Sequence, residues 1–172
     1  MPAVGWFQIH RINGEWHINV IDEVIHEKNI KTDELINIIK SKNYAVRQYY
    51  GDPAGMQAQG QSGLGDIEIF RRNGIYVQSV RDKTSRNIAS GISHVRGFIE
   101  NANDNRYLHL DRKCVGLAED LENYRYPEAV ENKHLKPEPL KDGRHDHGCD
   151  MLRYFFINQF PIKRNKIIMR NR

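Results

Sequence analysis

The pair Asn13-Gly14 constrains the fold most strongly, because it separates two runs that are rich in β-forming residues. The runs are Ala3–His10 and Glu15–Ile25, and apolar and polar residues alternate in the second from Trp16 to Val20. Asn-Gly readily supplies the two positive φ angles that a tight hairpin turn needs. The chain is therefore predicted to begin with an antiparallel hairpin.

Predicted helices and strands alternate after the hairpin. A helix is predicted near Thr32, whose side chain can cap it, and a strand that carries Val46, Gln48 and Tyr50 on one face. Alternation of this kind favours parallel pairing, so the predicted class is α/β with a mixed central sheet flanked by helices. The other predicted elements are a helix over Ile67–Arg72, a strand over Ile75–Val80, a long helix capped by Thr84 or Ser85 with apolar residues from Ile88 to Ile99, a strand over Tyr107–Leu110, a helix around Leu117 and Leu121, and a last helix from Arg144 or His145 to about Phe160.

Length and composition fit one compact domain. With 172 residues, of which 39% are hydrophobic, the chain can bury a core, so we predict a single domain over residues 1–172. Two cysteines are too few for a disulfide framework and fit a reducing compartment. No secretory segment or long apolar run is present, which predicts a soluble intracellular protein without a membrane partner.

The charge balance permits a polyanionic partner without requiring one. The 26 basic and 22 acidic residues give a net charge of +4. A tail over about 162–172 is basic and contains no acidic residue, which fits either phosphate binding or a solvated terminus. The candidate DNA-binding residues are Lys83, Arg86, Lys163 and Arg164.

The sharpest local feature is the acidic start of the last helix. Asp146 and Asp150 are four residues apart and His147 and Asp150 three apart, so their side chains can converge on one helix face. Two adjacent carboxylates repel each other unless a cation lies between them. The spacing fits a metal site and a salt-bridge cluster equally well, and Arg153 is the obvious partner for the second interpretation.

Asp52 shifts the balance toward a metal site. It follows the strand that contains Tyr50 and precedes Pro53, at the end of a sheet where open α/β folds gather ligands, although a turn aspartate is the simpler alternative. Oxygen ligands of this kind favour Mg²⁺ or Mn²⁺. The candidate catalytic residues are Asp52, Asp146 and Asp150, and the candidate metal ligands are the same three acids with His147.

Two other types of site are less favoured. Zinc could use His145, His147, Cys149 and Cys114, but these residues do not share one helical face and form no paired-cysteine motif. The segment 60–65 is rich in glycine but is not followed by Lys-Ser or Lys-Thr, so it is not a Walker loop and predicts no ATP hydrolysis.

Two motifs together resemble those of tailed-phage large terminase nuclease domains. The segment Tyr50–Gly55 resembles the strand motif that carries that family's second catalytic acid, and Asp146–Tyr154 resembles its final helix motif. The order of the intervening elements, including Leu117–Tyr124, extends the resemblance over nearly the whole chain. Either motif alone would be weak, but both in this order and spacing are fairly specific.

The resemblance implies a ribonuclease H-like fold and a two-ion site for Mg²⁺ or Mn²⁺. It implies cleavage of concatemeric double-stranded viral DNA by two-metal phosphodiester hydrolysis, in the cytoplasm of the host cell. Asp52 and Asp150 match the family's ligand positions, and Asp146 and His147 are additional ligand or supporting positions. The implied partners are DNA, the terminase ATPase domain, the small terminase and the portal protein.

One departure from the family bears on activity. The family places its first catalytic Asp on a strand that precedes the one starting here at Ala3, so we expect this first strand and the N-terminal ATPase domain to be absent, as in a truncated or split protein. Asp22 is a possible substitute, although a structural role is the more natural expectation for it. We therefore predict low or absent nuclease activity from this chain alone.

Two alternatives stay open at this point. Another ribonuclease H-like nuclease, of the resolvase or transposase type, would share the metal site but prefer a different DNA geometry. A nuclease-dead module that docks on DNA or on a portal-like ring would instead bind through its basic surface, without depending on metal. The DNA geometry that the protein prefers as substrate distinguishes the first alternative from a terminase nuclease. Salt-sensitive DNA binding that needs no metal would favour the second.

Overall fold

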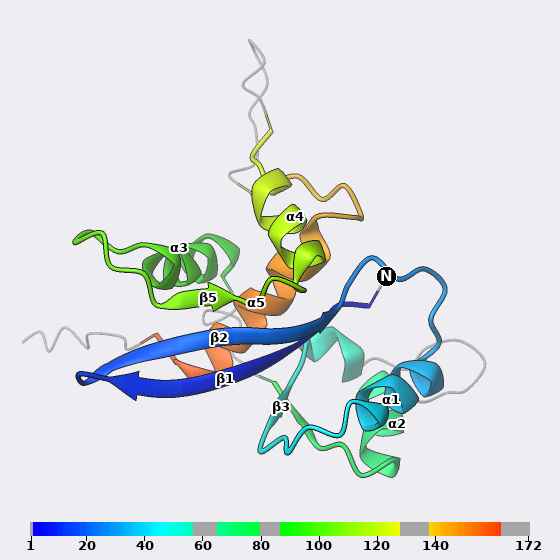
Figure 1. Ribbon diagram of the computed structural model, residues 1–172. Coiled ribbons are helices and arrows are strands. Elements are labelled where there is room, and N and C mark those ends of the chain that lie inside the picture. The colour runs from blue at the N-terminus through cyan, green and yellow to red at the C-terminus, as the bar shows by residue number, and fades with distance from the viewer. Residues whose placement is uncertain (1, 57–64, 80–86, 128–137, 163–172) are drawn as a thin grey trace, which may run out of the picture.

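The computed structural model describes residues 2–56, 65–79, 87–127 and 138–162, which fold into a mixed α/β structure (Figure 1). Most of the predicted elements are present. In chain order they are β1 (Val4–Ile12), β2 (Glu15–Val24), α1 (Thr32–Ser41), β3 (Tyr49–Tyr50), the 3-10 helix η1 (Pro53–Met56), α2 (Asp66–Arg72), β4 (Val77–Gln78), α3 (Ile88–Ile99), β5 (Leu108–Leu110), α4 (Val115–Asn123) and α5 (Asp146–Gln159).

The predicted hairpin is confirmed. β1 and β2 pair antiparallel, and Asn13 and Gly14 have φ angles of 52° and 89° at the turn between them. Two consecutive positive φ angles are what a type I′ turn requires. β5 pairs parallel with the other edge of β2, so the three-stranded sheet has the order β1-β2-β5.

The prediction of parallel pairing is also confirmed, but the later strands are shorter than expected. β3 and β4 form a separate parallel pair, in which Tyr49 lies opposite Val77. Val46 was predicted in the strand, but it lies before β3. Its side chain packs against a second hydrophobic cluster, which is formed by Trp6, Val24 and Leu35. Among the described residues no strand joins β1 to β3, so the mixed sheet is divided into two parts.

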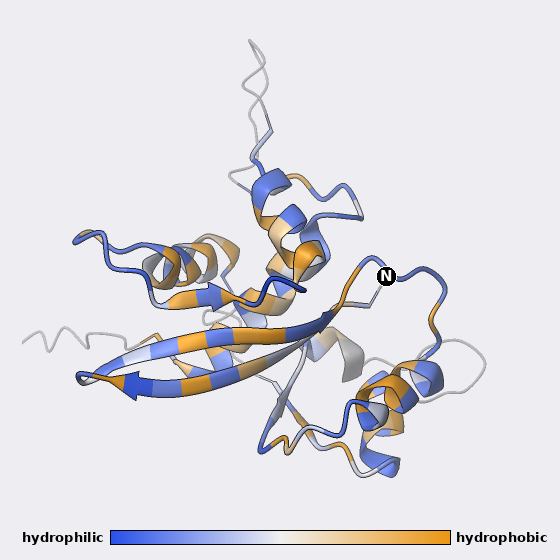
Figure 2. Ribbon diagram, in the orientation of Figure 1, coloured by the Kyte–Doolittle hydropathy of each residue, from blue (hydrophilic) through white to orange (hydrophobic). Residues whose placement is uncertain are grey.

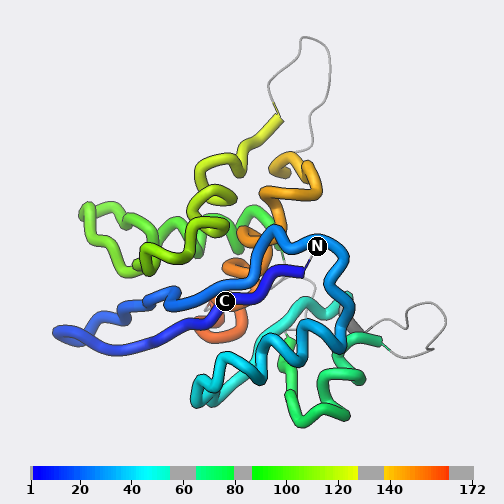
Figure 3. Tube along the Cα trace, turned by 45° about the vertical axis from the view of Figure 1, so that its right-hand side comes forward, coloured from blue at the N-terminus to red at the C-terminus, as the bar shows by residue number. Residues whose placement is uncertain are grey.

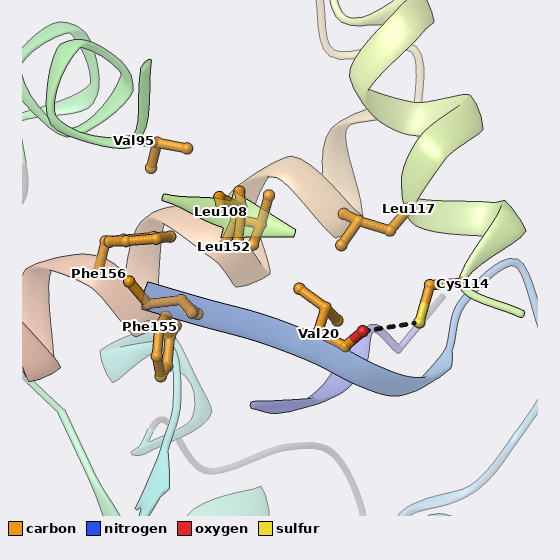
Figure 4. Close-up of a cluster of buried hydrophobic side chains, with 9 residues drawn as sticks. Val20, Val95, Leu108, Cys114, Leu117, Leu152, Phe155 and Phe156 are labelled. Carbon is orange, nitrogen blue, oxygen red and sulfur yellow. Dashed lines mark hydrogen bonds between the residues drawn. The ribbon is translucent and has the colours of Figure 1, made fainter. Parts of the chain in front are cut away.

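The main core lies between the three-stranded sheet and helices α3, α4 and α5 (Figure 4). Alternating hydropathy along the hairpin assigns one face of β2 to this core (Figure 2). Helices α1 and α2 lie on the side of the hairpin away from α3 and α4 (Figure 3). The buried residues of the main core are Ile18, Val20, Val95, Leu108, Cys114, Leu117, Leu152, Phe155 and Phe156.

Two predicted helix caps were wrong or fall outside the described residues. The N-cap of α1 is Lys31, whose backbone N–H donates to Glu34 at 2.8 Å, while the Thr32 hydroxyl donates to Asp66 instead. The N-cap of α3 is Asn87, which accepts from the Ser90 amide at 2.9 Å. The predicted caps Thr84 and Ser85 lie outside the described residues.

The hairpin turn gives a first prediction about stability. Gly14→Ala should lower the free energy of unfolding by about 1 kcal/mol, because Gly14 has a φ of +89° that alanine adopts only with strain. Gly97→Ala in α3 is the matched control, since open space surrounds both glycines and alanine favours a helix. Urea unfolding should rank Gly97→Ala above wild type and Gly14→Ala below it, and the reverse order would contradict the turn geometry.

Candidate active site

Helix α5 presents a stripe that contains Asp146, Asp150 and Tyr154, spaced four residues apart. Asp146 is only 6% exposed, and its buried Oδ1 has no hydrogen-bond partner among the described residues. Asp150 is partly exposed, with 20% of its side-chain surface open. The predicted extent of this helix is confirmed, and it places both acids on one side as the spacing indicated.

Two cations neutralise Asp150 in this structure. Arg153 donates to Oδ1 from Nη2 at 2.8 Å and from Nε at 3.2 Å, and Lys141 donates to Oδ2 at 3.3 Å. Arg153 is 4% exposed; burial lowers its pKa, but the carboxylate of Asp150 outweighs burial and the net pKa is raised. The Asp150 charge raises the pKa of Lys141 as well. The described structure therefore contains the salt-bridge cluster that the acidic spacing of α5 allowed, with Arg153 as the expected partner.

Asp52 approaches the same stripe from another element. It is exposed between β3 and η1, and its Oδ1 accepts from the Ala54 amide at 2.9 Å, which is a turn contact. Burial raises the pKa of Tyr154, and the Asp52 carboxylate lies close enough to raise it further. Tyr154 is one helical turn, about 6 Å, beyond Asp150. Asp52 therefore lies near the Tyr154 end of this stripe.

The donor set fits a hard divalent cation, although it is not gathered into one coordination group. Carboxylate oxygens are the ligands that Mg²⁺ and Mn²⁺ prefer, and the unpaired Oδ1 of Asp146 is a buried acceptor that a cation would satisfy. His147, the fourth predicted ligand, is half-buried on the next position of α5. Within the described residues no three His, Cys, Asp or Glu side chains are arranged to hold an ion.

A buried carboxylate that the sequence analysis missed fixes the start of α5. Asp120, on α4, is 0% exposed; its Oδ2 accepts from the Gly148 amide at 2.8 Å and its Oδ1 contacts His26 Nε2 at 2.6 Å. A Cβ at position 148 would collide with this carboxylate, so glycine is required there. The network ties α4 and the segment after β2 to the helix that carries Asp146 and Asp150.

Helix α4 is itself fixed by β2. Both carboxylate oxygens of Glu23 accept from α4 amides, Oε1 from Gly116 at 2.7 Å and Oε2 from Leu117 at 3.0 Å. These amides belong to the first turn, where the helix dipole favours negative charge. A chain of buried or partly buried contacts therefore runs from the sheet through α4 to α5.

The more exposed contacts beside this network give a prediction about His145. Its Nδ1 lies 2.6 Å from Asp142 Oδ2 and its Nε2 lies 3.4 Å from Glu119 Oε1, and chiefly the Asp142 contact raises its pKa. NMR titration should give a His145 pKa above its ordinary value. Asp142→Asn should lower that pKa more than Glu119→Gln does, and no change with either variant would contradict the contact.

The sign of this effect on stability follows from linkage. A histidine whose pKa is raised by folding stabilises the folded protein fully below the pKa of the unfolded chain. That contribution is lost as the pH rises through the pKa of the folded protein.

Asp22, the possible substitute for the family's first acid, has a structural role. It is 7% exposed and accepts from Lys42 Nζ at 2.9 and 3.0 Å and from the Tyr44 hydroxyl at 3.0 Å. Burial tends to raise the pKa of Asp22, but these hydrogen bonds prevail and the net pKa is lowered. The expectation of a structural aspartate fits this environment.

The cysteines have the properties of core residues. Both are free and buried, and burial raises the pKa of Cys114 to about 11 and that of Cys149 to about 12. Cys114 Sγ donates to the Val20 carbonyl at 3.5 Å (Figure 4). Zinc binds thiolates, which these environments disfavour, so the zinc alternative receives no support from the cysteines.

The remaining predicted contacts are not described. The candidate DNA-binding residues Lys83, Arg86, Lys163 and Arg164 all lie outside the described residues.

No helix in the described part of the chain combines the length and apolar character that crossing a bilayer requires.

Comparison with solved structures decides the fold. No protein-family model matches the sequence, and no curated protein matches it significantly. The nuclease domain of the large terminase g2p from bacteriophage SPP1, solved with bound Mn, superposes with a TM-score of 0.59 over 92% of this chain and 80% of that chain, at 16% identity. This chain has the fold of a large terminase nuclease domain. The ribonuclease H-like terminase fold predicted from the two motifs is thus confirmed.

Proposed function

We infer that this chain is a metal-dependent endonuclease domain of a viral genome-packaging terminase that cuts concatemeric double-stranded DNA. One observation carries the inference: in a chain with the terminase nuclease fold, Asp52, which follows β3, lies near Tyr154, and Tyr154 is one helical turn after Asp150 on α5. The proposed cofactor is a pair of Mg²⁺ or Mn²⁺ ions. The SPP1 domain was solved with bound Mn, which is an ion of the class that these oxygen ligands favour.

The acidic residues have separate roles in this proposal. Asp52 and Asp150 would be the principal ligands, and Asp146 would use its unpaired buried oxygen as an additional or supporting ligand beside His147. When bound, the ions would stabilise negative charge on the attacked phosphate and on the attacking and leaving oxygens. Arg153 would keep Asp150 oriented, because its guanidinium is held in place by burial.

The Lys141 side chain would move away from Asp150 when an ion binds this carboxylate. Its side chain is 57% exposed, so moving it into solvent exposes little new surface, whereas Arg153 is enclosed. Lys141 and Arg153 compete with an ion for Asp150, and Asp22, the possible substitute for the first acid, is paired with Lys42. Ion binding should therefore be weak. We therefore expect slow cleavage by this chain alone, which assays at millimolar Mn²⁺ over hours would detect.

The test is Mn²⁺-dependent cleavage of linear and supercoiled double-stranded DNA. Wild type should cut slowly, Asp150→Asn should be inactive, and Glu122→Gln, an exposed substitution on the neighbouring α4, should match wild type. Cleavage that persists in Asp150→Asn or without a divalent ion would overturn the proposal. Metal-independent, salt-sensitive DNA binding without any cleavage would instead support a nuclease-dead docking module.

A further inference from the structure

A row of three histidines crosses the three-stranded sheet. His10, His17 and His109 come from β1, β2 and β5, and His10 lies directly opposite His17 in the antiparallel register. The rings of His17 and His109 are stacked, with centroids 5.5 Å apart and planes 5° apart. His10 continues the row, with its centroid 5.8 Å from that of His17 and an interplanar angle of 20°.

This row is on the sheet face that the main core does not use. Ile18 and Leu108, which are adjacent in sequence to His17 and His109, are buried in the core. Successive side chains of a strand point to opposite faces, so the histidines project away from it. His109 is exposed and His17 and His10 are half-buried. Two of the candidate acids, Asp146 and Asp150, are on α5, which packs on the core side.

We propose that His17 and His109 together bind a transition-metal ion of the Zn²⁺, Ni²⁺ or Cu²⁺ class. His17 Nδ1 lies 3.2 Å from His109 Nε2. Two nitrogens at this separation can each lie about 2.0–2.1 Å from one ion, with a nitrogen–metal–nitrogen angle of about 100°, close to that of a tetrahedron. The two nitrogens face each other in this structure, so chelation requires the rings to release the proton that they share and to turn until both nitrogens face the ion.

The ligand chemistry separates this site from the acidic one. Imidazole nitrogen suits Zn²⁺, Ni²⁺ and Cu²⁺, whereas Mg²⁺ prefers oxygen. In the register around the pair, Asn19 lies opposite both His109 and Gln8, and these neutral side chains add no anionic ligand. Because the described residues contain no cluster of three metal-binding side chains, the ion would keep solvent at its other positions unless His10 turns toward it.

An ion held in this way would fasten β5 to β2. The two strands pair over only three residues, so the sheet depends on few backbone contacts at this edge. A ligand that binds the folded chain and not the unfolded chain raises the melting temperature. The site therefore has a structural consequence that needs no DNA and no cleavage.

The experiment is calorimetric titration of NiCl₂ into the untagged chain, with melting temperatures measured at each metal concentration. We expect one tight site and a rise in melting temperature. His17→Gln and His109→Gln should each weaken Ni²⁺ at least about tenfold and remove the rise, since even indirect losses around metal ligands cost about 10–100-fold in affinity. His147→Gln, in the candidate acidic site, is the matched control and should bind Ni²⁺ like wild type.

Two results would overturn the proposal. One is wild-type affinity in both sheet variants, and the other is loss of Ni²⁺ binding in His147→Gln, which would place the ion on α5. Melting curves without metal show whether the sheet variants are folded. Nitrogen couplings in the Cu²⁺ electron paramagnetic resonance spectrum give a second readout, which should indicate two imidazoles in wild type and one in either sheet variant.

Discussion

Asp52→Asn is expected to lower the rate of Mn²⁺-dependent DNA cleavage on the order of 100-fold or more while leaving the melting temperature unchanged. Asp52 is exposed, and in the described part of the chain its Oδ1 accepts a hydrogen bond from the Ala54 amide. The Oδ1 of asparagine can accept the same bond, so the turn is preserved. What the variant loses is the negative charge and one carboxylate oxygen of the proposed metal site.

This variant separates function from stability more cleanly than Asp150→Asn does. Asp150 balances the charge of the buried Arg153, so its replacement also leaves an enclosed cation without its partner. Asp33→Asn, an exposed acid in the first turn of α1, controls for loss of one charge. Equal cleavage rates for wild type and Asp52→Asn would exclude Asp52 as a ligand.

Asp120→Ala should lower the free energy of unfolding by about 3 kcal/mol, because it removes the acceptor of two buried or partly buried contacts and opens a cavity. The Gly148 amide and His26 both lose their partner. For a chain of 172 residues this corresponds to a fall of roughly 6–12 °C in melting temperature. Differential scanning calorimetry measures this directly.

Asp120→Asn is the informative companion variant. Its amide oxygen can still accept from Gly148, while the charge that faces His26 is gone, so its melting temperature should fall between those of wild type and Asp120→Ala. Glu122→Gln, on the exposed side of α4, should melt like wild type. An Asp120→Ala protein as stable as wild type would mean that α5 does not depend on this carboxylate.

Short-range patterns in the sequence predicted much of the fold. Asn13-Gly14 determines a turn by its own backbone preferences, and the spacing of apolar residues along α5 determines which face it buries. Both features are read within a few residues of the chain. The helix over Asp146–Gln159 and the hairpin were therefore predicted closely.

Contacts between distant residues could not be predicted in this way. Asp120 meets His26 across 94 positions and Gly148 across 28, so the residues around it in the sequence do not show the partners that it has in the fold. The only available signal was its spacing, since Asp120 is three residues after the buried Leu117 on the same helix face. Similarly, Lys141 reaches Asp150 across a loop, whereas Arg153, three residues away on the helix, was identified in advance as a partner.

Calorimetric titration of Mn²⁺ into wild type, Asp150→Asn and Lys141→Ala tests the central claim most directly. If Asp150 is a metal ligand and Lys141 competes with the ion, binding is weak in wild type, lost in Asp150→Asn and tighter in Lys141→Ala. Mn²⁺ affinity that is the same in all three proteins would contradict the account, because the ion would then bind away from this stripe of α5.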